Sequence, residues 1–231
     1  MNRKVQKPDR AAPVAFGTKA ETLARLAPLL RSARVLPLRH FTVSAWRADA
    51  AAAIAGIDAE PWSAGPLIVR SSARSEDTLK SSEAGRYVSV GNVGGREALS
   101  AAIERVIASF GEAGAEDQVL VQPMLAGVGI SGVAFSRDPN TSSPYVVINY
   151  DDHGDTSAVT GGKGDHLKTF ICWKHRIERC PPALRGIVDL LNELEKLLGS
   201  DSLDVEFAVD AEGACPSAGA AADRKAPGRA A

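Results

Sequence analysis

The chain has 231 residues, of which 45% are hydrophobic and 24% are charged, a composition typical of a globular protein with one large domain or two small lobes. Its formal net charge of −1 gives no global electrostatic basis for binding nucleic acid or an anionic membrane. No apolar run approaches the roughly 20 residues that a membrane-spanning helix needs. We therefore expect a cytoplasmic protein that binds neither nucleic acid nor a membrane. The basic segment 1–15 is followed by no apolar signal core, and we expect it to be disordered.

The first half of the chain alternates helices with short strands. A run of leucines at helical spacing follows Thr18, which is a possible N-cap. The predicted elements are, in chain order, a helix over 21–32, a strand over 41–46, a helix over 46–57, strands over 67–71 and 87–90, and a helix that Gly94 and Gly95 open. The polar segment 111–117 marks the predicted boundary between an N-terminal lobe, 16–115, and a C-terminal lobe, 116–213.

The second half is dominated by short strands joined by turn-forming residues. Strands are predicted over 118–124, 131–135, 145–150, 167–173 and 203–209, with one helix over 183–198. Because no helix separates the first four strands, we expect their sheet to be antiparallel. The low-complexity tail, 214–231, has almost no large apolar residue to offset its ordering entropy, so we expect it to be disordered.

The cysteines do not form the pattern of a disulfide framework, because there are three of them at loose spacing. Cys172 and Cys180 flank His175, which suggests a metal clip. Zinc takes about four ligands, however, and no fourth ligand lies at a suitable spacing. The favoured interpretation is therefore two ordinary thiols and a surface histidine.

Arg70 ends a predicted strand and is followed by a serine-rich loop that reaches Gly85. A guanidinium is a rigid fork of donors that matches a phosphate, and a glycine lets the backbone approach a ligand closely. This pattern suits a loop that folds over an anion. A surface loop in which Arg70 pairs with Glu76 or Asp77 explains the same residues and is favoured on residue types alone.

Two acidic residues alternate with apolar ones in the last predicted strand. Asp204 and Glu206 lie two residues apart and therefore point to the same face of the strand. Neighbouring carboxylates repel each other unless a cation separates them, and their hard oxygen atoms suit Mg²⁺. The simpler interpretation is a half-exposed edge strand whose acids are solvated.

Lys19 precedes the first predicted helix, where its ammonium and the helix N-terminus both favour a phosphate. Alone this is a weak signal, since most exposed lysines bind nothing specific. Together with Arg70 and the paired acids it points to one ligand, a nucleotide polyphosphate with Mg²⁺. The sequence has neither the glycine-rich P-loop motif nor the dinucleotide-binding motif, which disfavours those two folds.

Six segments carry a stronger signal than any single residue. They are GTKAETLARL, VRSSARSED, SSEAG, VLVQPML, SGVAFSRDP and LDVEF, and they span roughly residues 16–210. In content and order they resemble the ATP-binding domain of the phosphoenolpyruvate synthase and pyruvate phosphate dikinase family. This resemblance implies an α+β ATP-grasp fold, in which two lobes with mostly antiparallel sheets clamp ATP.

The resemblance also implies roles for individual residues. Lys19 and Arg70 contact the phosphates, Gly85 lies in the loop that covers them, Gln122 and Met124 form the hinge that receives adenine, and Glu206 holds Mg²⁺ with Asp204 beside it. In the family, ATP phosphorylates a histidine on a separate domain, and the phosphoryl group then passes to pyruvate. Such a site needs no nucleophile of its own, because positioning and charge neutralisation carry the reaction.

Two segments depart from the family pattern. INYDDHGDTSAVTGG replaces a more apolar stretch that carries a glutamate, for which Asp155 is a candidate substitute. His153 in this segment is interpreted as a solvated loop residue. The family's final strand ends in Gln-x-Arg-Pro about a dozen residues after the glutamate, but here the corresponding position falls near Ala218, in AGAAAD.

The chain therefore resembles a truncated ATP-binding domain. For one choice of codons, a one-base shift converts AGAAAD into Gln-Val-Arg-Pro-Gln, so a frameshift in the tail is a hypothesis that the gene sequence tests. We expect the chain to bind ATP with Mg²⁺ and to donate a phosphoryl group to a histidine on a separate domain or partner. The alternatives are a catalytically inactive remnant and a regulatory nucleotide-binding protein.

Overall fold

Two β-sheets organise the computed structural model, which describes residues 12–73, 88–111, 114–154, 167–174, 176–211 and 216–223. The helices are α1 (Lys19–Leu26), α2 (Val43–Ala48), α3 (Ala50–Asp58), α4 (Arg96–Ser109) and α6 (Arg185–Leu198). The strands are β1 (Arg34–Val35), β2 (Arg39–Thr42), β3 (Leu67–Ser72), β4 (Ser89–Val93), β5 (Gln118–Pro123), β6 (Val128–Phe135), β7 (Tyr145–Asp151), β8 (Lys168–Trp173), β9 (Leu203–Asp210) and β10 (Ser217–Asp223).

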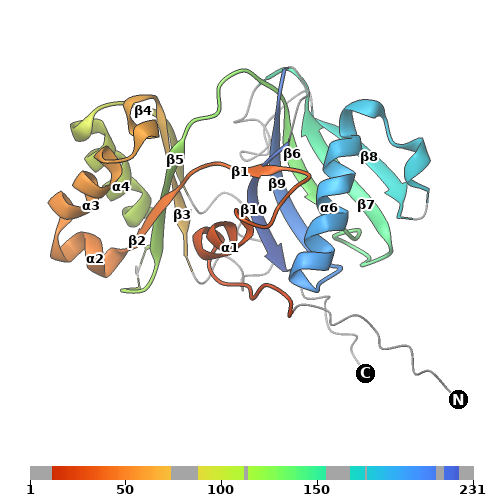
Figure 1. The fold of residues 1–231 in the computed structure, drawn as a ribbon, viewed down its shortest axis with the longest axis horizontal. Helices are drawn as coiled ribbons and strands as arrows, with labels where there is room; N and C mark the ends of the chain where they lie inside the picture. The colour runs from red at the N-terminus through yellow and green to blue at the C-terminus, as the bar shows by residue number, and fades with distance from the viewer. Residues whose placement is uncertain are drawn as a thin grey trace, which may run out of the picture.

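The first sheet has four antiparallel strands in the order β2-β5-β3-β4, with α2, α3 and α4 beside it (Figure 1). Its core contains Val69 of β3 and Val119 and Val121 of β5, which pack with Ile103 and Val106 of α4. These valines alternate along their strands, so that the residues between them point to the opposite face. The face of β3 that points away from this core faces the second sheet. Arg70 on that face lines a cavity together with residues of β9 and β10.

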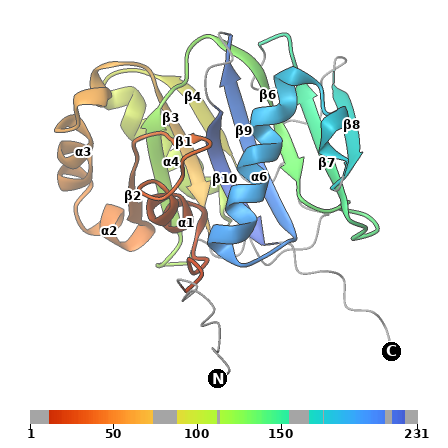
Figure 2. The same ribbon diagram turned by 45° about the vertical axis from the view of Figure 1, so that its right-hand side comes forward.

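The second sheet has six strands in the order β1-β10-β9-β6-β7-β8. All its pairings are antiparallel except that of β1 with β10, which is parallel. Helix α6 lies across one face of this sheet (Figure 2) and packs Ile187, Leu190 and Leu194 into a core with Val205 and Phe207 of β9. The alternate residues of β9 consequently point away from α6.

The fold confirms the predicted α+β class. Of the four strands predicted to share an antiparallel sheet, β6, β7 and β8 do so, whereas β5 lies in the first sheet. Two elements differ from the prediction. The first helix begins at Lys19 and ends at Leu26 instead of covering 21–32. The strand expected over 41–46 ends at Thr42, and residues 43–46 already belong to helix α2, because the Thr42 side chain caps this helix by accepting a hydrogen bond from the Ala45 N–H group.

The predicted lobe boundary at residue 116 does not follow the sheets. Strand β5 was assigned to the C-terminal lobe, yet it lies between β2 and β3 in the first sheet. Conversely, β1 pairs with β10 of the second sheet, and Leu26 of α1 belongs to the core beneath α6. The chain therefore crosses between the lobes more often than the polar segment 111–117 suggested, because pairing of strands distant in sequence decides lobe membership.

The tail contains a strand, so the expectation of disorder from residue 214 onward is wrong for residues 217–223. Strand β10 pairs with β9 on one side and, through Ser217 and Ala218, with β1 on the other. The prediction considered only side-chain burial, whereas a strand between two neighbours is stabilised by backbone hydrogen bonds that alanine makes as well as any residue. Residues 212–215 and 224–231 lie outside the described residues.

The start of the described chain is also ordered, which corrects the expectation of disorder for residues 12–15. The Val14 N–H group donates a hydrogen bond to the Leu197 carbonyl at 2.8 Å, and Val14 and Phe16 pack against the core beneath α6. The basic, alanine-rich segment is therefore ordered by two apolar side chains, because they pack against the core near the end of α6. Residues 1–11 lie outside the described part of the chain.

Cys172 and Cys180 are free, buried thiols, and burial raises the pKa of both. No group of three or more histidine, cysteine, aspartate or glutamate residues in the described part of the chain could hold a metal ion. His175 falls outside the described residues, so the interpretation of this segment as ordinary thiols stays a prediction. Across the described ranges, no helix has both the length and the apolar character that crossing a membrane requires.

Glu193 of α6 ties the helix to the segment between α1 and β1. Its carboxylate accepts hydrogen bonds from the Arg31 N–H group at 3.0 Å and from the Ser32 N–H group at 2.7 Å, and also from the Ser32 hydroxyl. Burial raises the pKa of Glu193, but these hydrogen bonds outweigh burial and hold the pKa below its ordinary value of 4.5.

Replacing Glu193 by alanine is expected to lower the free energy of unfolding by about 1–2 kcal/mol near neutral pH, allowing for solvent screening. Because the folded-state pKa is depressed, this stabilisation is present above the ordinary value of 4.5 and is lost as the pH falls below it. Denaturant unfolding at several pH values measures the difference. Glu178→Ala, which removes an exposed partner of Arg176, serves as the control and should change stability by less than about 0.5 kcal/mol.

Candidate functional site

A cavity of about 160 Å³ lies between the two sheets. Its walls come from β3 and β4 of the first sheet, from β6, β9 and β10 of the second, and from the segment that joins β5 to β6. Arg70, Met124 and Glu206 all line it, although the sequence separates them widely. Three of the residues predicted to form a site therefore meet at one place.

Strand register explains why Arg70 reaches this cavity. In the antiparallel pair of β3 and β5, Arg70 lies opposite Leu120 and Ser72 lies opposite Gln118. Directly opposed residues share a face of the sheet, and this face is the one opposite the valine core. Arg70 is only 9% exposed, so its guanidinium is held in the gap between the sheets and not in a surface loop as the simpler interpretation required.

Glu206 enters the cavity from the other side. Along β9, buried residues alternate with half-buried ones, and the buried set belongs to the core beneath α6. Glu206 and Asp204 are both half-buried and lie on the other face, as their spacing predicted. Glu206 lines the cavity, whereas Asp204 lies two residues away, opposite Phe135 of β6.

Two positively charged residues from separate elements meet at Glu206. The Arg70 guanidinium forms an ion pair with one carboxylate oxygen, and the Lys19 ammonium lies 3.8 Å from the other. Burial raises the pKa of Glu206, but the two cations outweigh burial and lower the pKa to about 2. Glu206 is therefore ionised at neutral pH, and it neutralises part of a positive cluster that would otherwise suit an anion.

Lys19 is placed by the N-terminus of α1. Thr18 is the N-cap, as predicted, and forms a reciprocal capping box with Glu21. Helix α1 lies between the two sheets in both views (Figures 1 and 2), so its first residue is close to strands of each lobe. The lysine thus approaches Glu206 from an element that belongs to neither sheet.

The predicted hinge pair is divided between the cavity and the protein interior. Met124 lines the cavity, and its N–H group donates to the Pro66 carbonyl at 2.8 Å. Gln122 is 3% exposed, and its amide donates a hydrogen bond to the Leu36 carbonyl at 3.2 Å. Gly85 lies outside the described residues, so its predicted place in a loop over the phosphates stays a prediction.

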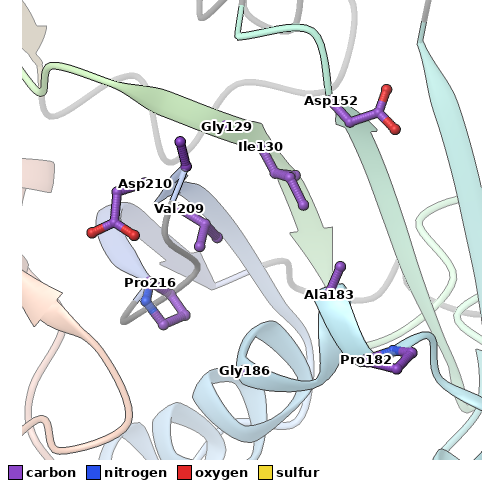
Figure 3. A pocket seen from close by; sticks show the side chains of 10 residues that line it. Gly129, Ile130, Asp152, Pro182, Ala183, Gly186, Val209, Asp210 and Pro216 are labelled. Atoms are coloured by element: carbon purple, nitrogen blue, oxygen red, sulfur yellow. The ribbon is translucent and has the colours of Figure 1, made fainter.

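A second cavity, of about 380 Å³, lies near the start of α6 (Figure 3). Its carboxylates already have cationic partners: Lys168 pairs with Asp152 at 2.6 Å, and Arg34 lies 4.0 Å from Asp210. The larger cavity therefore lacks the convergent charges of the smaller one. His153, close to this region, is exposed and lies 3.2 Å from Asp152, in keeping with its interpretation as a solvated loop residue.

Several polar residues of the site were not identified from the sequence. Ser89, Ser131 and Ser217 line the cavity from β4, β6 and β10, respectively. Gln118, at the start of β5, contacts the capping box of α1. Isolated serines and glutamines carry no spacing signal, so only the strand pairing brings them to the site.

Comparison with known proteins places these features in context. Residues 45–165 match the sequence family described as the pyruvate phosphate dikinase AMP/ATP-binding domain, which is just over half of the chain. The matched range includes Arg70, Gln122 and Met124 but excludes Lys19 and Glu206. A search of curated proteins finds no match to the chain.

Two solved structures illustrate what the chain is similar to. D-alanyl-alanine synthetase A from Vibrio cholerae matches with a TM-score of 0.50 and 14% identity, over 88% of this chain and 54% of that protein. VanG D-Ala:D-Ser ligase from Enterococcus faecalis matches with a TM-score of 0.49 and 18% identity, over 88% of this chain and 51% of that protein. The chain spans about half the length of each of these two proteins, and the likeness concerns the fold alone.

Proposed function

The chain belongs to the pyruvate phosphate dikinase AMP/ATP-binding domain family and has an ATP-grasp fold, and from this premise we propose that the cavity between its two sheets binds ATP together with Mg²⁺. One observation carries the proposal. Lys19, Arg70 and Glu206 come from α1, β3 and β9 and meet at the Glu206 carboxylate, and Arg70 and Glu206 line the cavity. Two cations and an ionised carboxylate suit a polyphosphate with a divalent metal ion.

Each residue has a proposed role in this site. The Arg70 guanidinium and the Lys19 ammonium bind the phosphate oxygens and orient the group to be transferred. Met124 and Gln122 belong to the hinge beside adenine, and Gly85 belongs to the loop over the phosphates. The adenine role is best supported for Met124, which lines the cavity, since the Gln122 amide is bonded to Leu36.

The acidic residues suit a magnesium ion. Glu206 is ionised, and Asp204 shares its face of β9, so that the pair offers the hard oxygen ligands that Mg²⁺ prefers. When bound, the ion would neutralise phosphate charge. Binding would also require Arg70 and Lys19 to exchange their carboxylate partner for phosphate oxygens, since one carboxylate now occupies both cations.

The finer proposal is phosphoryl transfer to a histidine on a separate domain or partner protein. It is supported by the resemblance of the six sequence segments and by the family match. The site would contribute charge neutralisation and alignment of ATP, while the partner would supply the nucleophile. The proposed setting is the cytoplasm, where ATP and Mg²⁺ are both available.

A second candidate function, a nucleotide-binding regulator without phosphoryl transfer, is favoured by strand β10. The backbone of Ala220 pairs directly with Glu206, so the strand beside the carboxylate offers no charged or amide side chain at that position. The family's final strand supplies a glutamine and an arginine here. A site without them would still bind the nucleotide but would stabilise the transition state of phosphoryl transfer less.

Titration calorimetry of the whole chain with ATP tests the proposal. We expect one binding site, with clearly tighter binding when Mg²⁺ is present than when it is chelated. Absence of heat and of any displacement of a fluorescent ATP analogue would contradict ATP binding. Release of AMP on adding a phosphohistidine-domain partner would then separate the phosphotransferase from the regulator, which binds ATP but releases no AMP.

A further inference from the structure

Gln118 is a buried amide at the start of β5, with 6% exposure, and it lies outside the cavity. We infer that Gln118 is a positioning residue that holds Lys19 at the phosphate end of the ATP site. The inference rests on the proposed function, because it assigns a task to Lys19 there. It concerns a residue that touches neither the nucleotide nor the metal ion.

The Gln118 amide contacts both members of the α1 capping box. Its carbonyl oxygen accepts a hydrogen bond from the Thr18 hydroxyl at 2.7 Å, and its amide nitrogen donates to the Glu21 carboxylate at 2.9 Å. Thr18 and Glu21 already cap the helix through each other's backbone N–H groups. A single side chain of the first sheet, Gln118, therefore fixes the first turn of α1 through both residues of its capping box.

Ser72 adds a third anchor from the neighbouring strand. It lies directly opposite Gln118 in the pairing of β3 with β5, and its fully buried hydroxyl accepts a hydrogen bond from the Ala20 N–H group at 2.9 Å. The anchored residues, at positions 18, 20 and 21, surround Lys19 in sequence. The lysine backbone is consequently fixed while its long side chain extends toward Glu206.

The same strand pair carries Arg70. Along β3, Arg70 lies two residues before Ser72, and on β5 its opposite residue is Leu120, which packs against Ala20 and Leu23 of α1. The anchors of α1 and the guanidinium are thus parts of one rigid unit. Gln118 therefore sets the distance between the Lys19 ammonium and the Arg70 guanidinium. This distance determines whether both cations can bind the same polyphosphate.

A purely stabilising role for this amide makes a different prediction. A buried hydrogen-bonded side chain that only stabilises the fold would affect every ligand of the site alike, and its effect would add to that of Lys19. A positioning residue affects only ligands that Lys19 contacts, and its effect disappears once the lysine is removed.

A double-mutant cycle with Gln118→Met and Lys19→Ala tests the inference on the whole chain. ATP with Mg²⁺ and adenosine, which lacks phosphates, are the two titrated ligands. We expect Gln118→Met to weaken ATP binding by about tenfold and adenosine binding by less than about twofold. In the Lys19→Ala background, Gln118→Met is expected to change ATP affinity by less than about twofold.

A donor–acceptor exchange guards against a variant that simply misfolds. Gln118→Glu keeps the acceptor for Thr18 but places a carboxylate against Glu21, and it is expected to weaken ATP binding. Adding Glu21→Gln restores a donor–acceptor pair with reversed direction and is expected to recover most of the affinity. Trp46→Phe removes the partly buried hydrogen bond to Glu104 elsewhere in the first lobe and should leave ATP affinity unchanged, as a control for general destabilisation.

The outcomes separate the inference from its premise. If the wild-type chain fails to bind ATP with Mg²⁺, the proposed function falls and the inference with it. If the wild-type chain binds ATP but the Gln118 and Lys19 effects are additive, or equal for ATP and adenosine, only the positioning role is overturned. Failure of Glu21→Gln to improve the Gln118→Glu variant contradicts the positioning role as well.

Discussion

Replacing Arg70 by alanine is expected to weaken ATP binding by about 100-fold or more, leaving little that calorimetry can measure. Arg70 is 9% exposed and lines the cavity, where a charge-assisted contact with phosphate contributes about 3 kcal/mol. Removing Arg70 also leaves the Glu206 carboxylate with one cationic partner fewer, so this carboxylate repels an incoming polyphosphate more strongly. The affinity for ATP with Mg²⁺, measured by titration calorimetry, gives the size of the effect.

The fold should survive this change, because the neighbouring valines of β3 and β5 form the core without Arg70. Arg96→Ala is a matched control: it removes another arginine that pairs with a carboxylate, Asp58, on the surface of the same lobe. We expect unchanged ATP affinity in the control. An Arg70→Ala chain that is folded by circular dichroism and binds ATP as the wild type does would remove Arg70 from the site.

Replacing Glu206 by glutamine is expected to change metal dependence in two opposite ways. Binding of ATP with Mg²⁺ should weaken by about tenfold, because the metal loses an ionised ligand. Binding of metal-free ATP should tighten, because the carboxylate no longer competes with phosphate for Arg70 and Lys19. The ratio of ATP affinity with Mg²⁺ to ATP affinity without Mg²⁺ therefore decreases, because the first affinity falls and the second rises.

Titrations with ATP in excess Mg²⁺ and in excess chelator measure this ratio directly. The pKa of Glu206, about 2, keeps the carboxylate ionised well below neutral pH, so the comparison can be made near pH 7 without a titration of this group. Asp210→Asn, on the same strand but beside Arg34, is the control and should leave the Mg²⁺ effect intact. A nucleotide affinity that ignores Mg²⁺ in both the wild type and Glu206→Gln would argue against the metal role.

The elements of the second half were predictable from sequence, because their signals are local. Leu203, Val205 and Phe207 alternate with acids, and the structure buries the first set and leaves Glu206 in the cavity. Likewise, the helix predicted over 183–198 is present as α6, whose apolar residues bury one face. Patterns of period two or 3.6 specify which face is buried without any knowledge of the partner.

The features that sequence reasoning missed depend on partners far along the chain. Strand β10 consists mainly of alanine and forms because β9 and β1 offer it backbone hydrogen bonds. Gln118 carries no motif and gains its place from Thr18, 100 residues earlier. The meeting of Lys19, Arg70 and Glu206 was expected from the ligand that suits all three and from the family resemblance, since no local pattern relates residues of α1, β3 and β9 to one another.

The parallel pairing of β1 with β10 has a consequence for how the protein is made. Arg34 pairs with Ser217, 183 residues further along, so this pairing forms only after a much later segment has been synthesised. The four-stranded sheet needs nothing beyond β5 and can close during synthesis, whereas the six-stranded sheet is completed late. Until then α1 has its anchors in the four-stranded sheet but not its contacts with β10, and a nascent chain would have Arg70 and Lys19 in place before Glu206 of β9.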